Sequence, residues 1–233
     1  HLSSDDKIVH PILPFKITLL ANKSQISRLA YNTLLIGLKK RNSLTKTPTE
    51  LKWLRDIGCV EEGTLYVIRL ATRNTFLQTF HYRIVSRIIA TNTFLHRIGR
   101  SESPTCDLCR SHDETLYHLF WGCAVVQNFI ENIKTYLKDK FNIHLGCRAK
   151  RWFFPRVEQG NIIMLIITLI KLAIFKSKRN QGRPHLNRFI ALLKIEAQKE
   201  QLYFRRLKKE NAFVQKWGEV AKILTDDFSS VRP

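Results

Sequence analysis

The sequence is poor in acidic residues relative to basic ones. Its 233 residues include 39 lysines and arginines but only 19 aspartates and glutamates, which leaves a formal net charge of +20 and a pI of about 10.1. A globular chain this basic favours a polyanionic partner. Nucleic acid is the commonest one, because each phosphate that a protein neutralises releases condensed counterions.

The sequence also lacks a secretory signal and a long apolar run. The longest apolar stretch, residues 162–175, contains Thr168 and Lys171 and would span only about 21 Å as a helix. The hydrocarbon core of a bilayer is about 30 Å thick, so this stretch predicts a buried helix and we expect no membrane partner. Without a signal, five cysteines are typical of a reducing compartment, where thiols bind metal or stay free.

Alternating strand patterns and internal repeats are nearly absent, which predicts a mainly α-helical fold of one or more helical bundles. Phe76, Phe80, Ile84 and Ile88 recur every fourth residue and indicate a helix over residues 75–90. Further helices are expected over residues 50–57, behind Thr49 as a cap, over residues 162–175, and from about residue 185 to 209.

Three cysteines and a histidine are concentrated between residues 106 and 123. Cys106 and Cys109 form a CxxC pair, His118 follows after eight residues, and Cys123 after four more. Two thiolates at this spacing can close on one ion from a tight turn, and a second ligand pair completes a tetrahedron. Because four protein ligands leave no position for water, we predict a structural Zn²⁺ rather than a catalytic one.

Local signals predict how the second ligand pair is placed. Ser111 and Glu114 fit the S-x-x-E capping pattern, which would begin a short helix carrying His118. On an ideal helix Cys123 would lie about 140° around the axis from His118. Gly122 is placed to end the helix first, so Cys123 need not lie on it.

Two other interpretations of the cysteines are open. The CxxC pair can be a redox centre, although no strand precedes it, or the cluster can be buried thiols beside a surface histidine. Cys59 and Cys147 lie outside the cluster and are expected to be simple buried residues.

The flanks of the cluster carry a longer pattern. Before the cluster, a helix carries F-x-Y-R followed by Arg and Ile residues, and then the dipeptide TN: these are Phe80, Tyr82, Arg83, Arg87, Ile88, Ile89, Thr91 and Asn92. The CxxC, an ET…HLF stretch and a last Cys follow: these are Cys106, Cys109, Glu114, Thr115, His118, Leu119, Phe120 and Cys123. This pattern resembles the zinc-binding region that follows the reverse transcriptase domain in LINE-type (non-LTR) retrotransposon polyproteins. The P-x-L-x-x-F helix and final Trp, here Pro184, Leu186, Phe189 and Trp217, resemble the tail of the same polyproteins.

The resemblance implies a C-terminal segment of a replicase that nicks target DNA and copies its own RNA there. It implies binding chiefly to element RNA, possible contact with target DNA, support of target-primed reverse transcription, and association with the polymerase and endonuclease domains of the same polyprotein. It also implies a cytoplasmic ribonucleoprotein and a nuclear location. Because the chain starts without Met and lacks polymerase carboxylates, we expect it to be one portion of a longer polyprotein.

We expect three parts along the chain. Residues 1–58 would be a helical connector following a polymerase domain, and residues 59–146 a helical segment with the CCHC zinc module. Residues 147–233 would form a basic helical C-terminal domain, with the boundary in the mixed basic and aromatic stretch that begins after Gly146.

Candidate phosphate contacts lie in runs of cations, although such runs are most often solvated faces. They are Arg83 and Arg87; Lys150 and Arg151; Lys171, Lys176, Lys178, Arg179, Arg183 and Arg188; and Arg205, Arg206, Lys208 and Lys209. Trp152 and Phe153 stand beside the second group, where they can either stack unpaired bases or belong to the core. We expect the RNA contacts to lie away from the zinc.

No catalytic residue is predicted. A reverse transcriptase needs an Asp pair on a hairpin plus a third carboxylate, whereas Asp226 and Asp227 have neither a strand pattern nor a third acid nearby and are expected to form a solvated tail. A restriction-like nuclease is a weaker alternative, because Glu196 and Lys199 lack the preceding PD and D. The other alternative is a structural scaffold that packs on the polymerase domain without contacting RNA.

Overall fold

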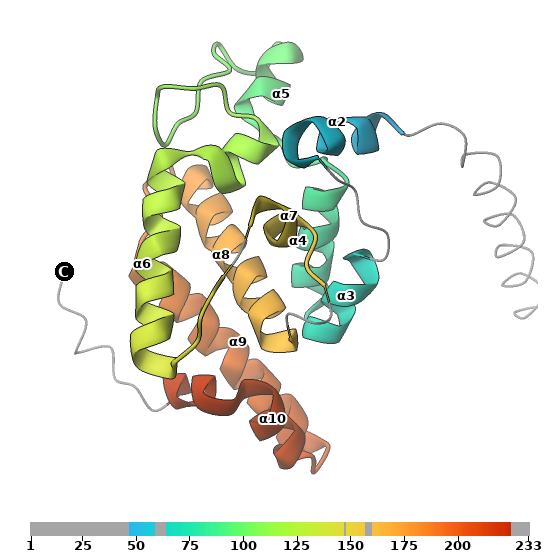
Figure 1. Cartoon of the computed structure of the whole chain (residues 1–233), viewed down its shortest axis with the longest axis vertical. Helices are drawn as coiled ribbons and strands as arrows, with labels where there is room; N and C mark the ends of the chain where they lie inside the picture. Colours follow the sequence, from blue (N-terminus) through green and yellow to red (C-terminus); the bar gives the residue numbers. More distant parts are fainter. Residues whose placement is uncertain (1–46, 59–63, 147, 157–159, 225–233) are drawn as a thin grey trace, which may run out of the picture. The chain divides into compact units, whose positions relative to one another are not determined.

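The computed structural model describes residues 47–58, 64–146, 148–156 and 160–224 (Figure 1). The described residues from Thr49 onward fall into one compact unit, so the expected boundaries after residues 58 and 146 both lie within it. Cys59, Cys147, Asp226 and Asp227, and the expected connector up to residue 46, lie outside the described residues.

The described part of the chain is built from helices and contains no β-strand, which confirms the predicted mainly α-helical fold. In chain order the elements are α2 (Pro48–Ile57), α3 (Thr64–Ala71), α4 (Thr75–Val85), α5 (Asn92–Arg97), the π-helical turn η1 (His118–Gly122), α6 (Ala124–Phe141), α7 (Ala149–Phe153), α8 (Asn161–Arg179), α9 (Leu186–Arg206), α10 (Glu210–Trp217) and the 3₁₀ helix η3 (Gly218–Leu224).

Helix α4 is shorter than its sequence pattern predicts. Asn74 begins it by accepting a hydrogen bond from Phe76 N, as a cap residue does. It ends at Val85 rather than near residue 90, because Arg87 adopts a left-handed conformation (φ 56°) that a helix cannot continue through. The chain then turns toward α5, which is capped by Thr91.

Helix α8 is the central element of this unit, with α6 on one side and α3 and α4 on the other (Figure 1). It is buried along most of its length, from Met164 to Ile174, as its apolar sequence predicts. Within the described residues, no helix combines the length and apolar character needed to cross a membrane.

A set of tryptophans connects the helices around α8. Trp53 of α2 packs against Phe153 of α7, with ring centroids 4.8 Å apart, and its Nε1 donates to the Val85 carbonyl at 2.8 Å. Trp152 packs against Trp121, with ring centroids 5.4 Å apart, beside the zinc segment. Trp152 and Phe153 are therefore core residues, so the alternative that they stack RNA bases is wrong.

Candidate metal centre

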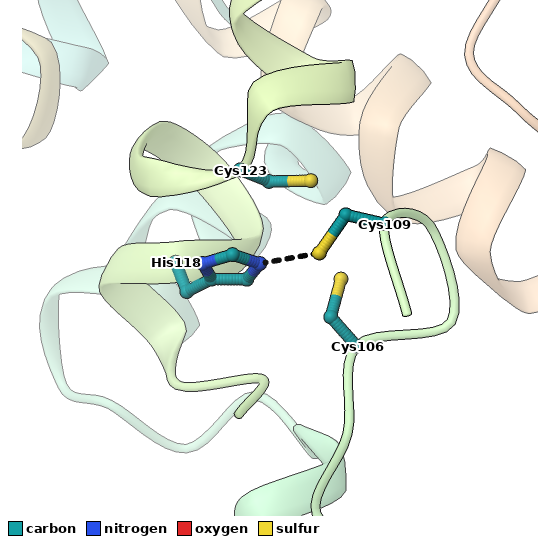
Figure 2. A group of neighbouring side chains, drawn as sticks. All are labelled: Cys106, Cys109, His118 and Cys123. Atoms are coloured by element: carbon teal, nitrogen blue, oxygen red, sulfur yellow. Dashed lines mark hydrogen bonds between the residues drawn. The ribbon is translucent and has the colours of Figure 1, made fainter. Parts of the chain in front are cut away.

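The four predicted ligands meet at one point (Figure 2). Their ligand atoms all lie within 4.8 Å of one another, and Cys109 Sγ is 3.3 Å from His118 Nε2. Zinc bonds of about 2.3 Å to sulfur and about 2.0–2.1 Å to nitrogen place tetrahedral ligand atoms about 3.6–3.8 Å apart. Small side-chain movements therefore suffice for one zinc ion, and no other such group was found among the described residues.

The first ligand pair lies in a tight turn. Arg110 N donates to the Cys106 carbonyl at 2.8 Å, and Arg110 itself has a left-handed backbone (φ 54°). Cys106 N donates to the His112 carbonyl at 2.8 Å, which returns the chain beside its own start. The turn directs both thiols to the same side, as the CxxC spacing predicts.

The second ligand pair is brought together by a π-helical turn, which the sequence did not predict. Cys123 N donates to the His118 carbonyl at 2.9 Å, the i→i+5 bond of a π-helix. The helix ends at Gly122, and Cys123 has an extended backbone (φ −74°, ψ 127°) outside it. The prediction that Gly122 ends the helix before Cys123 is thus confirmed. The π-turn also reduces the angle of about 140° that would separate His118 from Cys123 around the axis of an α-helix.

The predicted capping residues are wrong. His118 N donates to Thr115 Oγ1 at 3.0 Å, so Thr115 caps the turn. Ser111 Oγ instead donates to the Cys109 carbonyl at 2.9 Å, and Glu114 is drawn into the interior by a different set of partners. Ser111 is therefore bound back to the CxxC turn instead of capping the helix.

The protonation of two of the four ligands, Cys123 and His118, suits metal binding. Cys123 has its pKa lowered to about 7, first because it accepts a hydrogen bond from Cys106, while that bond and burial raise the pKa of Cys106. Burial, and then the charge of nearby His112, lower the pKa of His118, so its ring is neutral at neutral pH. A neutral imidazole and a thiolate are the forms that bind zinc.

This geometry decides between the open interpretations of the cysteines. His118 is 9% exposed and lies against the thiols, so it is not a surface histidine. The CxxC pair lies in a turn with two further ligands at hand, rather than between a strand and a helix as a redox pair would.

A buried polar network adjoins the zinc loop. Glu114 is fully buried, accepts from Asn92 N at 2.9 Å and forms an ion pair with Lys178 of α8. Asn92 Nδ2 donates to the Thr105 carbonyl at 2.7 Å and to Asp107 Oδ1 at 2.9 Å, and Lys178 Nζ donates to Asn92 Oδ1 at 2.8 Å. Asn92 and Glu114, from the TN and ET of the sequence pattern, therefore connect the zinc loop to α8. Lys178 and Asp107 were not predicted in this role.

Three predicted phosphate contacts are wrong because their side chains are engaged inside the protein. Lys171 is fully buried and donates to the Trp152 carbonyl, and Lys178 is only 9% exposed in its ion pair with Glu114. Arg87 pairs with Asp56 and lies over the Trp53 ring, 4.1 Å from its centroid. None can reach a phosphate without leaving these partners.

The remaining predicted cations stay at or near the surface. The exposed ones are Arg83, Lys176, Arg179, Arg183, Arg205, Arg206, Lys208 and Lys209. The half-buried ones are Lys150, Arg151 and Arg188, and the Arg188 guanidinium donates to Ser177 Oγ. A pocket of about 320 Å³ is lined by residues 107–110 of the zinc loop together with Lys178, Gln181, Gly182 and Arg183. Of the predicted cations, Lys178 and Arg183 therefore lie beside the zinc loop, and whether RNA binds away from the zinc stays a prediction.

Comparison with known proteins identifies the segment that holds the cluster. Residues 71–129 match a protein family described as zinc-binding in reverse transcriptase. No curated protein matches the chain. The matched segment includes all four ligands and the Asn92 and Glu114 network, but not α8, α9 or α10. This part of the chain is therefore similar to a zinc-binding region found in reverse transcriptases.

Proposed function

We propose that the chain is an RNA-binding C-terminal segment of a LINE-type retrotransposon replicase, in which a structural zinc ion holds the RNA-binding surface in place. The observation that carries the proposal is a closed Cys₃His site within a reverse-transcriptase zinc region, next to exposed cations at the end of α8. In this role the segment supports target-primed reverse transcription by positioning element RNA.

The structural role of zinc rests on its closed ligand set and on what the ligands join. Cys106 and Cys109 come from the loop after α5, while His118 and Cys123 lead directly into α6. Cys106 and Cys123 are fully buried members of the main hydrophobic core, so a metal between them would fix this part of the core. Binding of zinc and folding of the segment would then be one process.

The RNA contacts that we propose first are Lys176, Arg179 and Arg183. All three are exposed on the last turn of α8 and the turn after it, and Arg110 of the zinc loop is exposed and lines one pocket with Arg183. The network of Glu114, Asn92 and Lys178 would hold this turn against the zinc loop. Arg205, Arg206, Lys208 and Lys209, at the end of α9, form a second exposed group.

We assign no catalytic centre to this segment. Glu196, the acid of the weak nuclease pattern, accepts hydrogen bonds from Thr72 Oγ1 at 3.1 Å and Asn74 Nδ2 at 2.9 Å, which suits a structural carboxylate. Polymerase and endonuclease activities would reside in other domains of the same polyprotein. Target DNA as a second ligand, a cytoplasmic ribonucleoprotein and a nuclear site of action belong to the same proposal.

The test is binding of labelled RNA across a salt series. Each phosphate contact contributes about 0.7 to the slope of log K against log salt for a single strand, so Lys176, Arg179 and Arg183→Ala together should reduce its magnitude by about 2. A matched control removes three exposed lysines elsewhere, Lys52, Lys138 and Lys140. A wild-type chain that binds no RNA at low salt would refute the proposal in favour of a structural scaffold.

A further inference from the structure

A large cavity lies at the start of α8, away from the pocket beside the zinc loop. Residues of α3, α4, α9 and α10 surround it. Its volume is about 1110 Å³. It is lined by the end of α3, the connection from α3 to α4, the start of α8, and residues of α9 and α10. This volume is about the upper limit of the roughly 300–1,000 Å³ of pockets for small molecules, so the cavity has room for a large ligand. None of the cations predicted as phosphate contacts lines it.

The rim of the cavity is cationic. Arg69 and Arg73 lie at the end of α3 and just after it, Lys199 lies on α9, and all three are exposed. No described carboxylate forms an ion pair with any of them. Three cations from two separate segments therefore face one opening with their charges uncompensated by described residues.

The two carboxylates of the cavity do not cancel this charge at the rim. Glu196 is 3% exposed and accepts from Thr72 and Asn74, and Glu200 is 7% exposed and accepts from Trp217 Nε1 at 2.7 Å and from Lys216 Nζ at 2.6 Å. Both carboxylates are therefore buried and engaged by partners inside the protein. The start of α8, at Gly160 and Asn161, also lines it and adds the positive end of a nineteen-residue helix dipole.

An aromatic ring lies beside the cations. The guanidinium carbon of Arg73 lies 4.9 Å from the ring centroid of Tyr203, which is half-buried, and the Phe204 ring packs edge-on against Tyr203 at 5.4 Å. All three residues line the cavity. The guanidinium thus lies over one face of the Tyr203 ring, and together they form a layered pair on which an unpaired base can stack, while nearby cations hold the phosphates.

We propose that this cavity binds a single-stranded stretch of RNA, with its phosphates on Arg69, Arg73 and Lys199 and a base stacked at Tyr203. The inference rests on the proposed RNA-binding function and adds a second site, at the opposite end of α8 from Lys176, Arg179 and Arg183. A strand that is held at both sites would be gripped at two separated positions on the same unit.

The experiment measures binding of a fluorescein-labelled oligo(U) decamer to the whole chain by anisotropy, across a salt series. The triple variant Arg69, Arg73 and Lys199→Ala should bind the decamer about ten-fold more weakly. The slope of log K against log salt should also decrease in magnitude by about 2. The charge-matched control Lys52, Lys138 and Lys140→Ala should keep the wild-type slope. Zinc content and the melting temperature establish that each variant is folded.

Substitution of Tyr203 tests the stacking separately. Tyr203→Ala should weaken decamer binding at least about five-fold, while Tyr203→Phe, which keeps the ring, should bind like the wild type. An RNA hairpin duplex, whose bases are already paired, should be insensitive to Tyr203→Ala.

The outcomes distinguish the site from the function. If the wild type binds the decamer and the folded triple variant binds it equally well, the cavity site is overturned while the proposed function stands. If the wild type binds no RNA, both are overturned. If Tyr203→Ala weakens the decamer and the duplex equally, the stacking role is overturned.

Discussion

The sharpest stability prediction concerns the buried ion pair that connects α8 to the zinc loop. Lys178→Met removes the ammonium and leaves Glu114 with only the Asn92 N–H as its neutral donor, while its second carboxylate oxygen, Oε2, has no hydrogen-bond partner. Surface ion pairs contribute only about 0–1 kcal/mol, but Glu114 is 0% and Lys178 9% exposed. Breaking a pair buried to this degree costs about 3–5 kcal/mol, because a charge is left uncompensated.

The pH dependence of this loss has a definite sign. Burial raises the pKa of Glu114 above its ordinary value, and Lys178 opposes that shift. Removing Lys178 should raise the pKa further, so the folded variant binds a proton more tightly than its unfolded chain. Its deficit in folding free energy relative to the wild type should therefore be largest at neutral pH and shrink as the pH falls toward about 4.3, the ordinary carboxyl value.

The assay is urea unfolding followed by circular dichroism with zinc present. Lys176→Met, an exposed lysine on the same helix, is the control and should stay within about 0.5 kcal/mol of the wild type. Adding Glu114→Gln to Lys178→Met should recover part of the loss, since it removes the buried charge. A Lys178→Met variant within about 1 kcal/mol of the wild type at neutral pH would refute the reasoning.

The other predictions concern the metal site itself. Cys106→Ser should lose zinc and melt the surrounding segment, and a stable, metal-free variant with native circular dichroism would contradict the assignment. Gly122→Ala should weaken zinc binding, because the added Cβ would lie 3.2 Å from the Tyr117 ring, which must then shift beside the ligand His118; a wild-type zinc affinity in chelator competition would contradict this. Zinc affinity should fall about ten-fold or more between about pH 8 and about pH 6, as the thiolate of Cys123, with a metal-free pKa of about 7, takes up a proton; chelator competition measures this, and a flat profile would contradict it.

The zinc ligands could be predicted from the sequence because all four lie close together along the chain. A CxxC turn has little conformational freedom. Gly122, just before Cys123, indicated where the helix that carries His118 ends. The π-turn that closes the site could not be predicted, because it depends on one i→i+5 bond between His118 and Cys123 that has no composition signal.

Cations were harder to assign because their partners are distant in sequence. Lys178 pairs with Glu114, 64 positions away, and Arg87 with Asp56, 31 positions away. From the sequence alone, a lysine that faces solvent and one that faces a buried carboxylate on another helix have the same local neighbours. The cavity cations Arg69 and Arg73 were missed for the same reason, since only the fold brings them opposite Lys199.

Zinc-edge X-ray absorption on the purified chain tests the central claim, a single closed zinc site, most directly. One zinc per chain is expected, with three sulfur ligands at about 2.3 Å and one nitrogen at about 2.0–2.1 Å. A chain without zinc, or a spectrum with fewer sulfur ligands and bound water oxygen, would contradict it.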